Sequence, residues 1–123
     1  MYSQCSVCIK EGVVIPILVA HLVSVAFEAM AFEGYKKSAR AKLHEMSQMK
    51  VVAITASYGK TSIKNFLAQI LSTSFRVYAT PRSVNTLGGI VKDINESLPK
   101  ETQIYIVEAG ARAKGDIHEI ASL

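Results

Sequence analysis

The stretch I-T-A-S-Y-G-K-T-S at residues 54–62 decides the fold, because it joins a strand pattern to a helix pattern. Residues 50–55 (KVVAIT) are apolar and β-branched, which is typical of a short strand. Residues 62–73 (SIKNFLAQILST) repeat apolar side chains at helical spacing, which predicts one apolar face made of Ile63, Phe66, Leu67, Ile70 and Leu71. The intervening loop therefore leads from a strand directly into the first turn of a helix.

This loop has the residue types that bind a nucleotide phosphate. At a strand–helix junction the backbone N–H groups and the helix dipole favour an anion, and Gly59 lets the backbone pass close to it. Lys60 can reach the β- and γ-phosphates, and the Thr61 hydroxyl can bind Mg²⁺. The usual phosphate loop has a glycine where this chain has Ile54. An ordinary strand–helix turn with a surface lysine is the alternative.

The remaining chain continues the alternation of strands and helices. Residues 75–80 (FRVYAT) and 103–109 (QIYIVEA) read as strands, whereas residues 86–98 and 116–123 read as helices. The order β-α-β-α-β-α predicts an α/β fold with a parallel sheet of P-loop ATPase type. Three strands make only part of such a sheet.

Two polar side chains are expected near the loop. Glu108 closes the apolar strand IYIVE, so it should share the carboxyl edge of the sheet with Thr61 and could hold Mg²⁺ there. Asn85, in the loop of residues 81–89, emerges at the same edge and could contact a substrate. The alternatives are a glutamate that caps the next loop and a helix cap made by Asn85 or Thr86.

Composition limits the classes of function. The 123 residues suit one small domain, and half of them are hydrophobic. A net charge of +4, without aromatic residues among the basic ones, argues against a nucleic-acid partner. Cys5 and Cys8 form a C-x-x-C, but a zinc site needs two further ligands nearby and the three histidines are scattered. Both cysteines are therefore expected to be reduced, unpaired thiols.

The first part of the chain predicts a hydrophobic and basic helical segment over residues 1–49. Residues 13–32 have the length that spans a bilayer, with Pro16 in the first turn of the helix. A narrow polar stripe suits a helix that faces a partner or lies in the membrane surface; it consists of His21, Ser24 and Glu28. The basic, amphipathic residues 33–46 would hold that end in the cytoplasm. A buried helix of a soluble domain is the alternative, and a cleaved signal peptide fits less well.

Three motifs of residues 50–123, taken together, resemble the Mur ligases of peptidoglycan synthesis. The family's loop T-G-x-x-G-K-[ST] is matched, with Ala56 in place of its first glycine, by Thr55, Gly59, Lys60 and Thr61. The family's second loop, an asparagine followed by Ile-Gly, is similar to residues 84–88. Its third motif, E-x-G-A-x-x-x-G-[ED]-I, is matched by residues 108–117. The most similar branch is the one that adds D-alanyl-D-alanine to UDP-N-acetylmuramoyl-tripeptide.

The resemblance implies an ATP-dependent, amide-forming ligase of the cytoplasm that uses ATP and Mg²⁺. Its partners would be UDP-N-acetylmuramoyl-peptide and D-alanyl-D-alanine. Lys60 would have the catalytic role of neutralising the transferred phosphate, Thr61 and Glu108 would hold the metal, and Asn85 would contact the substrate. The implied ATP-binding residues are Thr55, Ala56, Ser57, Tyr58, Gly59, Lys60, Thr61 and Ser62.

Departures from the family leave other functions open. The family's N-terminal substrate domain and its later parts are missing, so we expect a fragment from the front of a ligase. A phosphate loop weakened by Ala56 is also expected if that residue needs a positive φ. The alternatives are another ligase of the superfamily such as folylpolyglutamate synthase, a membrane-associated P-loop ATPase, or a non-catalytic fragment. An anchor at residues 13–32 would place the protein at the inner face of the bacterial cytoplasmic membrane.

Overall fold

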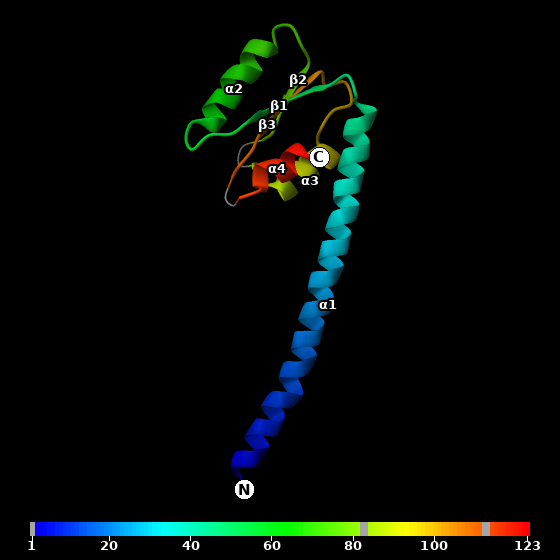
Figure 1. Ribbon diagram of the computed structural model, residues 1–123, viewed down its shortest axis with the longest axis vertical. Coiled ribbons are helices and arrows are strands. Elements are labelled where there is room, and N and C mark those ends of the chain that lie inside the picture. The colour runs from blue at the N-terminus through cyan, green and yellow to red at the C-terminus, as the bar shows by residue number, and fades with distance from the viewer. Residues whose placement is uncertain (1, 82–83, 112–113) are drawn as a thin grey trace. The chain divides into compact units, whose positions relative to one another are not determined.

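The computed structural model describes residues 2–81, 84–111 and 114–123, and it divides the chain into two compact units, Met1–Gly34 and Tyr35–Leu123. The predicted alternation of strands and helices is confirmed (Figure 1). The elements are α1 (Tyr2–Glu45), β1 (Lys50–Ile54), α2 (Lys60–Leu71), β2 (Val77–Ala79), α3 (Leu87–Glu96), β3 (Ile104–Glu108) and α4 (Asp116–Ala121).

The three strands form a parallel sheet in the order β1-β3-β2. In its register Ile54 pairs with Glu108, and Ala79 pairs with Ile106. The carboxyl ends of β1 and β3 therefore lie side by side, and the loops that follow them leave the sheet at one edge. The central strand β3 is buried along its whole length, as expected for a strand with helices on both faces.

Alternate side chains of β3 pack into two separate apolar clusters. Tyr105 and Val107 join α3 in one cluster, whereas Ile104 and Ile106 join α2 in the other. Figure 1 shows α2 on one side of the strands and α3 and α4 on the other. Because side chains alternate along a strand, Glu108 belongs to the face that α2 covers.

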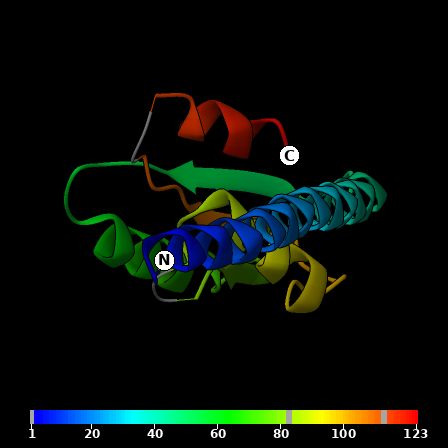
Figure 2. The same cartoon turned by 90° about the horizontal axis from the view of Figure 1, so that it is seen from below.

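The last helix, α4, lies beside the edge strand β1 (Figure 2). An apolar cavity of about 170 Å³ lies between them, and its lining includes Val51 and Ala53 of β1 and Ile117 and Ile120 of α4. Ile90 and Ile94 of α3, each only 1% exposed, line the same cavity, so the gap lies in the layer that α3 and α4 form on one face of the sheet.

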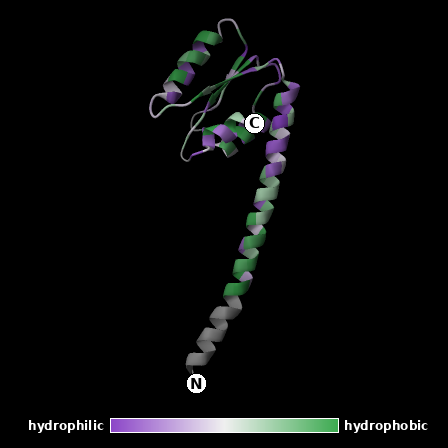
Figure 3. Cartoon of the chain, in the orientation of Figure 1, coloured by the Kyte–Doolittle hydropathy of each residue, from purple (hydrophilic) through white to green (hydrophobic). Residues whose placement is uncertain are grey.

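The predicted apolar face of α2 is wrong for three of its five residues. Leu67 and Leu71 pack against the sheet, but Ile63, Phe66 and Ile70 are 51%, 66% and 66% exposed. In Figure 3 the hydrophobic colour covers much of α2, including its outer side. The helix face toward the sheet instead carries Lys64, which is only 2% exposed, together with Leu67 and Leu71.

Within the unit Met1–Gly34, α1 begins at Tyr2, so Pro16 lies inside the helix and not in its first turn as predicted. Large apolar side chains between Val14 and Met30 are exposed by half or more, and Figure 3 shows this stretch as hydrophobic. The stretch beginning at Val14 is long and apolar enough to cross a membrane. The side chains of Cys5 and Cys8 lie outside the described residues, so their thiol state stays a prediction.

Within the unit Tyr35–Leu123, the last turns of α1 pack against α3. Ala39 is fully buried in the apolar cluster that contains Ile94. The Tyr35 hydroxyl donates to Glu96 at 2.9 Å, and Lys42 Nζ donates to the Ile94 carbonyl at 2.7 Å. This segment is therefore amphipathic, as predicted, with its buried face on the sheet domain.

Candidate functional site

The turn between β1 and α2 depends on a glycine with a left-handed backbone. Gly59 is the N-cap of α2 with φ 77°, and α2 begins at the next residue, Lys60. A Cβ at Gly59 would meet no atom within 4 Å. In this structure the backbone angle therefore requires glycine, since other residues rarely adopt a positive φ.

A shallow pocket of about 350 Å³ opens at this turn. It is lined by Ser57, Tyr58, Gly59, Lys60, Thr61, Ser62 and Glu108. The structure thus brings six of the predicted ATP-binding residues together with the predicted metal ligand. Thr55 and Ala56 are exposed and lie outside this lining, but the Ala56 carbonyl accepts a hydrogen bond from Lys60 Nζ.

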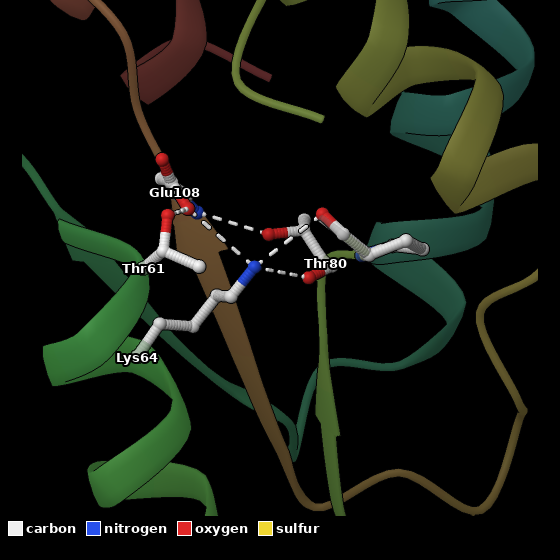
Figure 4. A network of polar contacts seen from close by, with 5 residues as sticks. Thr61, Lys64, Thr80 and Glu108 are labelled. Carbon is white, nitrogen blue, oxygen red and sulfur yellow. Dashed lines mark hydrogen bonds and ion pairs between the residues drawn. The ribbon is translucent and has the colours of Figure 1, made fainter. Parts of the chain in front are cut away.

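The Glu108 carboxylate is the centre of a buried polar network (Figure 4). Thr61 Oγ1 donates to Glu108 Oε2 at 2.9 Å, and Lys64 Nζ lies 3.5 Å from the same oxygen. Glu108 itself is only 5% exposed. A buried carboxylate is costly unless it is paired and hydrogen-bonded, and both conditions are met here. The backbone N–H of Glu108 also donates to Thr80 Oγ1 at 3.1 Å.

Lys64 is the site residue that the sequence analysis did not single out. Its Nζ donates to the Thr80 carbonyl at 2.6 Å and to the Pro81 carbonyl at 3.3 Å, in addition to the ion pair. Helical spacing could have found it, because a residue three positions after Thr61 lies on the same helix face. Because lysine side chains are usually exposed in proteins, the sequence alone gave no reason to expect this one to be buried at the site.

The loop that carries Asn85 is held at the end of β3. The backbone N–H of Gly110 donates to the Asn85 carbonyl at 2.8 Å, and a Cβ at Gly110 would lie 2.8 Å from that same oxygen. Glycine is therefore required at this crossing of two loops. The predicted cap is confirmed for Thr86, whose side chain accepts from the Gly89 N–H at 3.3 Å. Asn85 is absent from the lining of the pocket that contains Lys60.

The oxygen atoms of Thr61 and Glu108 fit a magnesium ion. Among the described residues there is no group of three or more His, Cys, Asp or Glu side chains that could hold a metal. Mg²⁺ does not need such a cage, because it commonly takes few protein oxygens and completes its shell with phosphate oxygens and water. A hydroxyl and a carboxylate 2.9 Å apart, beside a helix N-terminus, suit that requirement.

A parallel α/β sheet in which a glycine-lysine-threonine turn leads from a strand into a helix is typical of P-loop nucleotide-binding proteins. The model of the Mur ligase middle domain matches residues 54–123. The chain belongs to the Mur ligase family.

Relatives and solved structures agree with this membership. The chain is 33% identical over 85 residues to UDP-N-acetylmuramoyl-tripeptide–D-alanyl-D-alanine ligase of Bacillus subtilis (strain 168), covering 69% of this chain and 18% of that protein. It is 34% identical over 93 residues to the ligase of the same name from Rickettsia prowazekii (strain Madrid E), covering 76% and 20%. The chain therefore spans about a fifth of the length of the curated relatives it matches.

Among solved structures, MurF ligase of Thermotoga maritima in complex with ADP superposes with a TM-score of 0.68 and 32% identity. The match covers 73% of this chain and 21% of that one. The UDP-N-acetylmuramoylalanyl-D-glutamyl-2,6-diaminopimelate–D-alanyl-D-alanyl ligase from Acinetobacter baumannii superposes with a TM-score of 0.66 and 31% identity, covering 71% of this chain and 19% of that one. At this identity the likeness supports both the fold and the family.

Proposed function

We propose that residues 50–123 form the ATP-binding front of a ligase that adds D-alanyl-D-alanine to UDP-N-acetylmuramoyl-tripeptide. One observation carries the proposal: Lys60, Thr61 and Glu108 line a single pocket at the carboxyl edge of the sheet. The names of the relatives support the substrates, and the ADP in the Thermotoga structure supports the nucleotide. The activity belongs to a protein that includes the further parts present in these relatives.

In this reaction the peptide carboxylate takes the γ-phosphoryl group of ATP, and the amine of D-alanyl-D-alanine attacks the resulting acyl phosphate. Phosphate leaves and an amide forms. Negative charge crowds at the transferred group, so the proposed role of Lys60 is to neutralise it while the loop N–H groups hold the phosphates. Mg²⁺, when bound, would supply further positive charge, and Thr61 and Glu108 are the residues proposed to hold it.

The substitution Lys60→Ala tests the nucleotide role. We expect ADP binding, measured by calorimetry with Mg²⁺ present, to weaken by about 100-fold or more, which equals about 2.7 kcal/mol. The matched control is Lys92→Ala, because Lys92 is an exposed lysine on α3, outside the pocket. An unchanged ADP affinity in the Lys60 variant would refute the proposed phosphate contact.

The alternatives differ in what they do with ATP. A P-loop ATPase unrelated to cell walls would hydrolyse ATP without a muramoyl peptide, and folylpolyglutamate synthase would require a folate. We expect the whole protein to release phosphate only when both UDP-N-acetylmuramoyl-tripeptide and D-alanyl-D-alanine are present. Phosphate release that is independent of both would favour the ATPase.

A second proposal concerns the apolar part of α1, which we infer to associate with the cytoplasmic face of a membrane. The observation that favours it is an apolar stretch of helix whose side chains are exposed, including Leu18 at 54% and Leu22 at 67%. Burial of such a surface in lipid removes it from water, and the exposed Lys37 and Arg40 would meet anionic headgroups.

Membrane fractionation of the full chain with a C-terminal fluorescent reporter tests this inference. We expect the reporter in the membrane fraction, and carbonate extraction distinguishes a spanning helix from one that lies on the surface. The matched control carries Leu18→Arg and Leu22→Arg, which should return the reporter to the soluble fraction because central arginines oppose insertion. A soluble reporter on the unaltered chain contradicts membrane association.

A further inference from the structure

A buried lysine joins three segments that meet at the candidate site. Lys64 projects from α2 and is only 2% exposed. Its Nζ contacts the Glu108 carboxylate of β3 and the carbonyls of Thr80 and Pro81, which follow β2 (Figure 4). One ammonium group therefore links the helix of the phosphate loop, the proposed metal ligand, and the start of the loop that leads to Asn85.

We propose that Lys64 is a positioning residue that holds Glu108 against Thr61 and fixes the origin of the Asn85 loop. The proposal rests on the proposed function, since it concerns the same metal and nucleotide site. Lys64 is not itself one of the residues that line the pocket, but it contacts Glu108, which is, so its effect on ligands would pass through the groups it holds.

The ammonium group of Lys64 makes two hydrogen bonds and one ion pair. The distances from Nζ are 2.6 Å to the Thr80 carbonyl, 3.3 Å to the Pro81 carbonyl and 3.5 Å to Glu108 Oε2. An ammonium group has three donors and no acceptor, so three surrounding oxygen atoms suit its charge and its donors. A lysine whose only role is apolar packing usually buries its methylene groups and keeps its ammonium group in water. The ammonium group of Lys64 is buried instead.

The charge of Lys64 also favours an ordered carboxylate. Glu108 is nearly excluded from solvent, and a buried carboxylate with one partner removed is strongly disfavoured. Without the ammonium group of Lys64, the Glu108 carboxylate would keep only its contact with Thr61 on α2. The carboxylate would then be free to turn from Thr61 toward solvent, and the two oxygens that suit Mg²⁺ would separate.

A second tether completes the placement of the Asn85 loop. The Pro81 carbonyl is held by Lys64, whereas the Asn85 carbonyl accepts from the Gly110 N–H at 2.8 Å. Both tethers lead to the end of β3, because Gly110 follows Glu108 by two residues. Loss of Lys64 should therefore release the Pro81 carbonyl, while the Asn85 carbonyl stays attached to Gly110.

The test compares Lys64→Met, Lys64→Arg and the exposed control Lys92→Met on the full chain. The first readout is the Mg²⁺ concentration at the midpoint of ADP binding. We expect Lys64→Met to raise this midpoint by about 10- to 100-fold, as the loss of groups that hold metal ligands commonly does. Lys64→Arg keeps the charge and the N–H donors and should recover most of the loss, and Lys92→Met should have no effect.

The second readout is hydrogen exchange at the Glu108 amide, which donates to Thr80, and it needs no nucleotide. We expect faster exchange in Lys64→Met and unchanged exchange in the control.

The two readouts separate the two proposals. If the unaltered chain fails to bind ADP, the proposed function fails, and hydrogen exchange alone decides the role of Lys64. Should Lys64→Met not fold, Lys64→Gln replaces it, because its amide keeps a donor near the same carbonyls. A variant that loses thermal stability but keeps both the Mg²⁺ midpoint and the amide protection overturns the proposal.

Discussion

The helices α2 and α3 lie on opposite faces of the same small sheet and use their side chains in opposite ways. On α3 the apolar residues Ile90, Val91 and Ile94 are at most 1% exposed. On α2 the residue most fully buried is Lys64, while Phe66 and Ile70 are each 66% exposed. Apolar burial therefore fixes α3, whereas a charged network fixes the site end of α2.

The two faces of the sheet therefore differ in their main role: one supplies apolar burial, and the other holds the polar side chains of the candidate site. The α3 face carries the larger apolar cluster, which also takes up the end of α1. The α2 face has a smaller apolar cluster and also holds a lysine and a carboxylate. These two side chains lie at the edge where ligands bind in open parallel sheets. Changes on α3 should therefore lower stability, and changes on α2 should mainly alter binding.

The largest expected effect is on the stability of the α3 face. Ile94→Ala removes a buried side chain and should lower the free energy of unfolding by about 2 to 5 kcal/mol. Chemical denaturation followed by circular dichroism measures this loss. The matched control is Ile70→Ala on α2, the same change at an exposed position, which should cost about 0.5 kcal/mol or less. Equal losses in the two variants would remove the contrast between the helices.

A smaller loss is expected from the polar contact that α3 makes with the strands. Asp93 is 5% exposed, and its carboxylate accepts from the Tyr78 hydroxyl at 2.7 Å and from the Tyr105 hydroxyl at 3.0 Å. Asp93→Ala leaves both hydroxyls without this partner and should cost about 1 to 3 kcal/mol. The control is Glu96→Ala, an exposed acid on the same helix, which should change the unfolding midpoint less. A smaller loss for Asp93 than for Glu96 would contradict the importance of the tyrosine pair.

The same contact predicts how stability depends on alkaline pH. Burial and the neighbouring Asp93 raise the pKa of Tyr78 to about 12 and raise the pKa of Tyr105 still further. Folding therefore favours the neutral phenols, so this stability is fully present below pH 10 and is lost as the pH rises from 10 through the folded pKa values. Urea midpoints measured between pH 8 and pH 12 should fall above about pH 10. Tyr105→Phe should flatten that decline, and an equally steep decline in this variant would show another cause.

The smallest expected effect is on the outer surface of α2. Phe66→Ser replaces a side chain that is 66% exposed and makes no contribution to either apolar cluster. We expect the free energy of unfolding to change by about 0.5 kcal/mol or less. Thermal unfolding of the two proteins side by side is sufficient to measure this. A large destabilisation would mean that the outer face of α2 is covered in solution.

Much of the fold could be predicted from local patterns. The alternation of strands and helices, the parallel sheet and the Thr86 cap all follow from short stretches of sequence, and each is present in the structure. The placement of Glu108 beside Thr61 also follows, because parallel strands bring their carboxyl ends to one edge. Their contact at 2.9 Å agrees with that expectation, whereas their role toward a metal stays a proposal.

Other features needed the tertiary structure. The rule that apolar residues face inward misplaced Ile63, Phe66 and Ile70, and it gave no reason to expect a lysine on the buried face of α2. The Tyr78–Asp93–Tyr105 contact joins residues from three elements, with no local signal that links them. The requirement for Gly59 was expected from close passage of phosphates, but the structure adds a left-handed φ as a separate reason.

The register of β1 and β3 also limits insertions and deletions. Ile54 pairs with Glu108, and the Ala109 N–H donates to the Ile54 carbonyl at 2.9 Å. Deleting a single residue from β3 would turn the glutamate to the opposite face of the sheet, away from Thr61. Protein engineers can therefore vary side chains in these strands, but should make changes of length in the turn around residue 100, at the opposite end of the sheet.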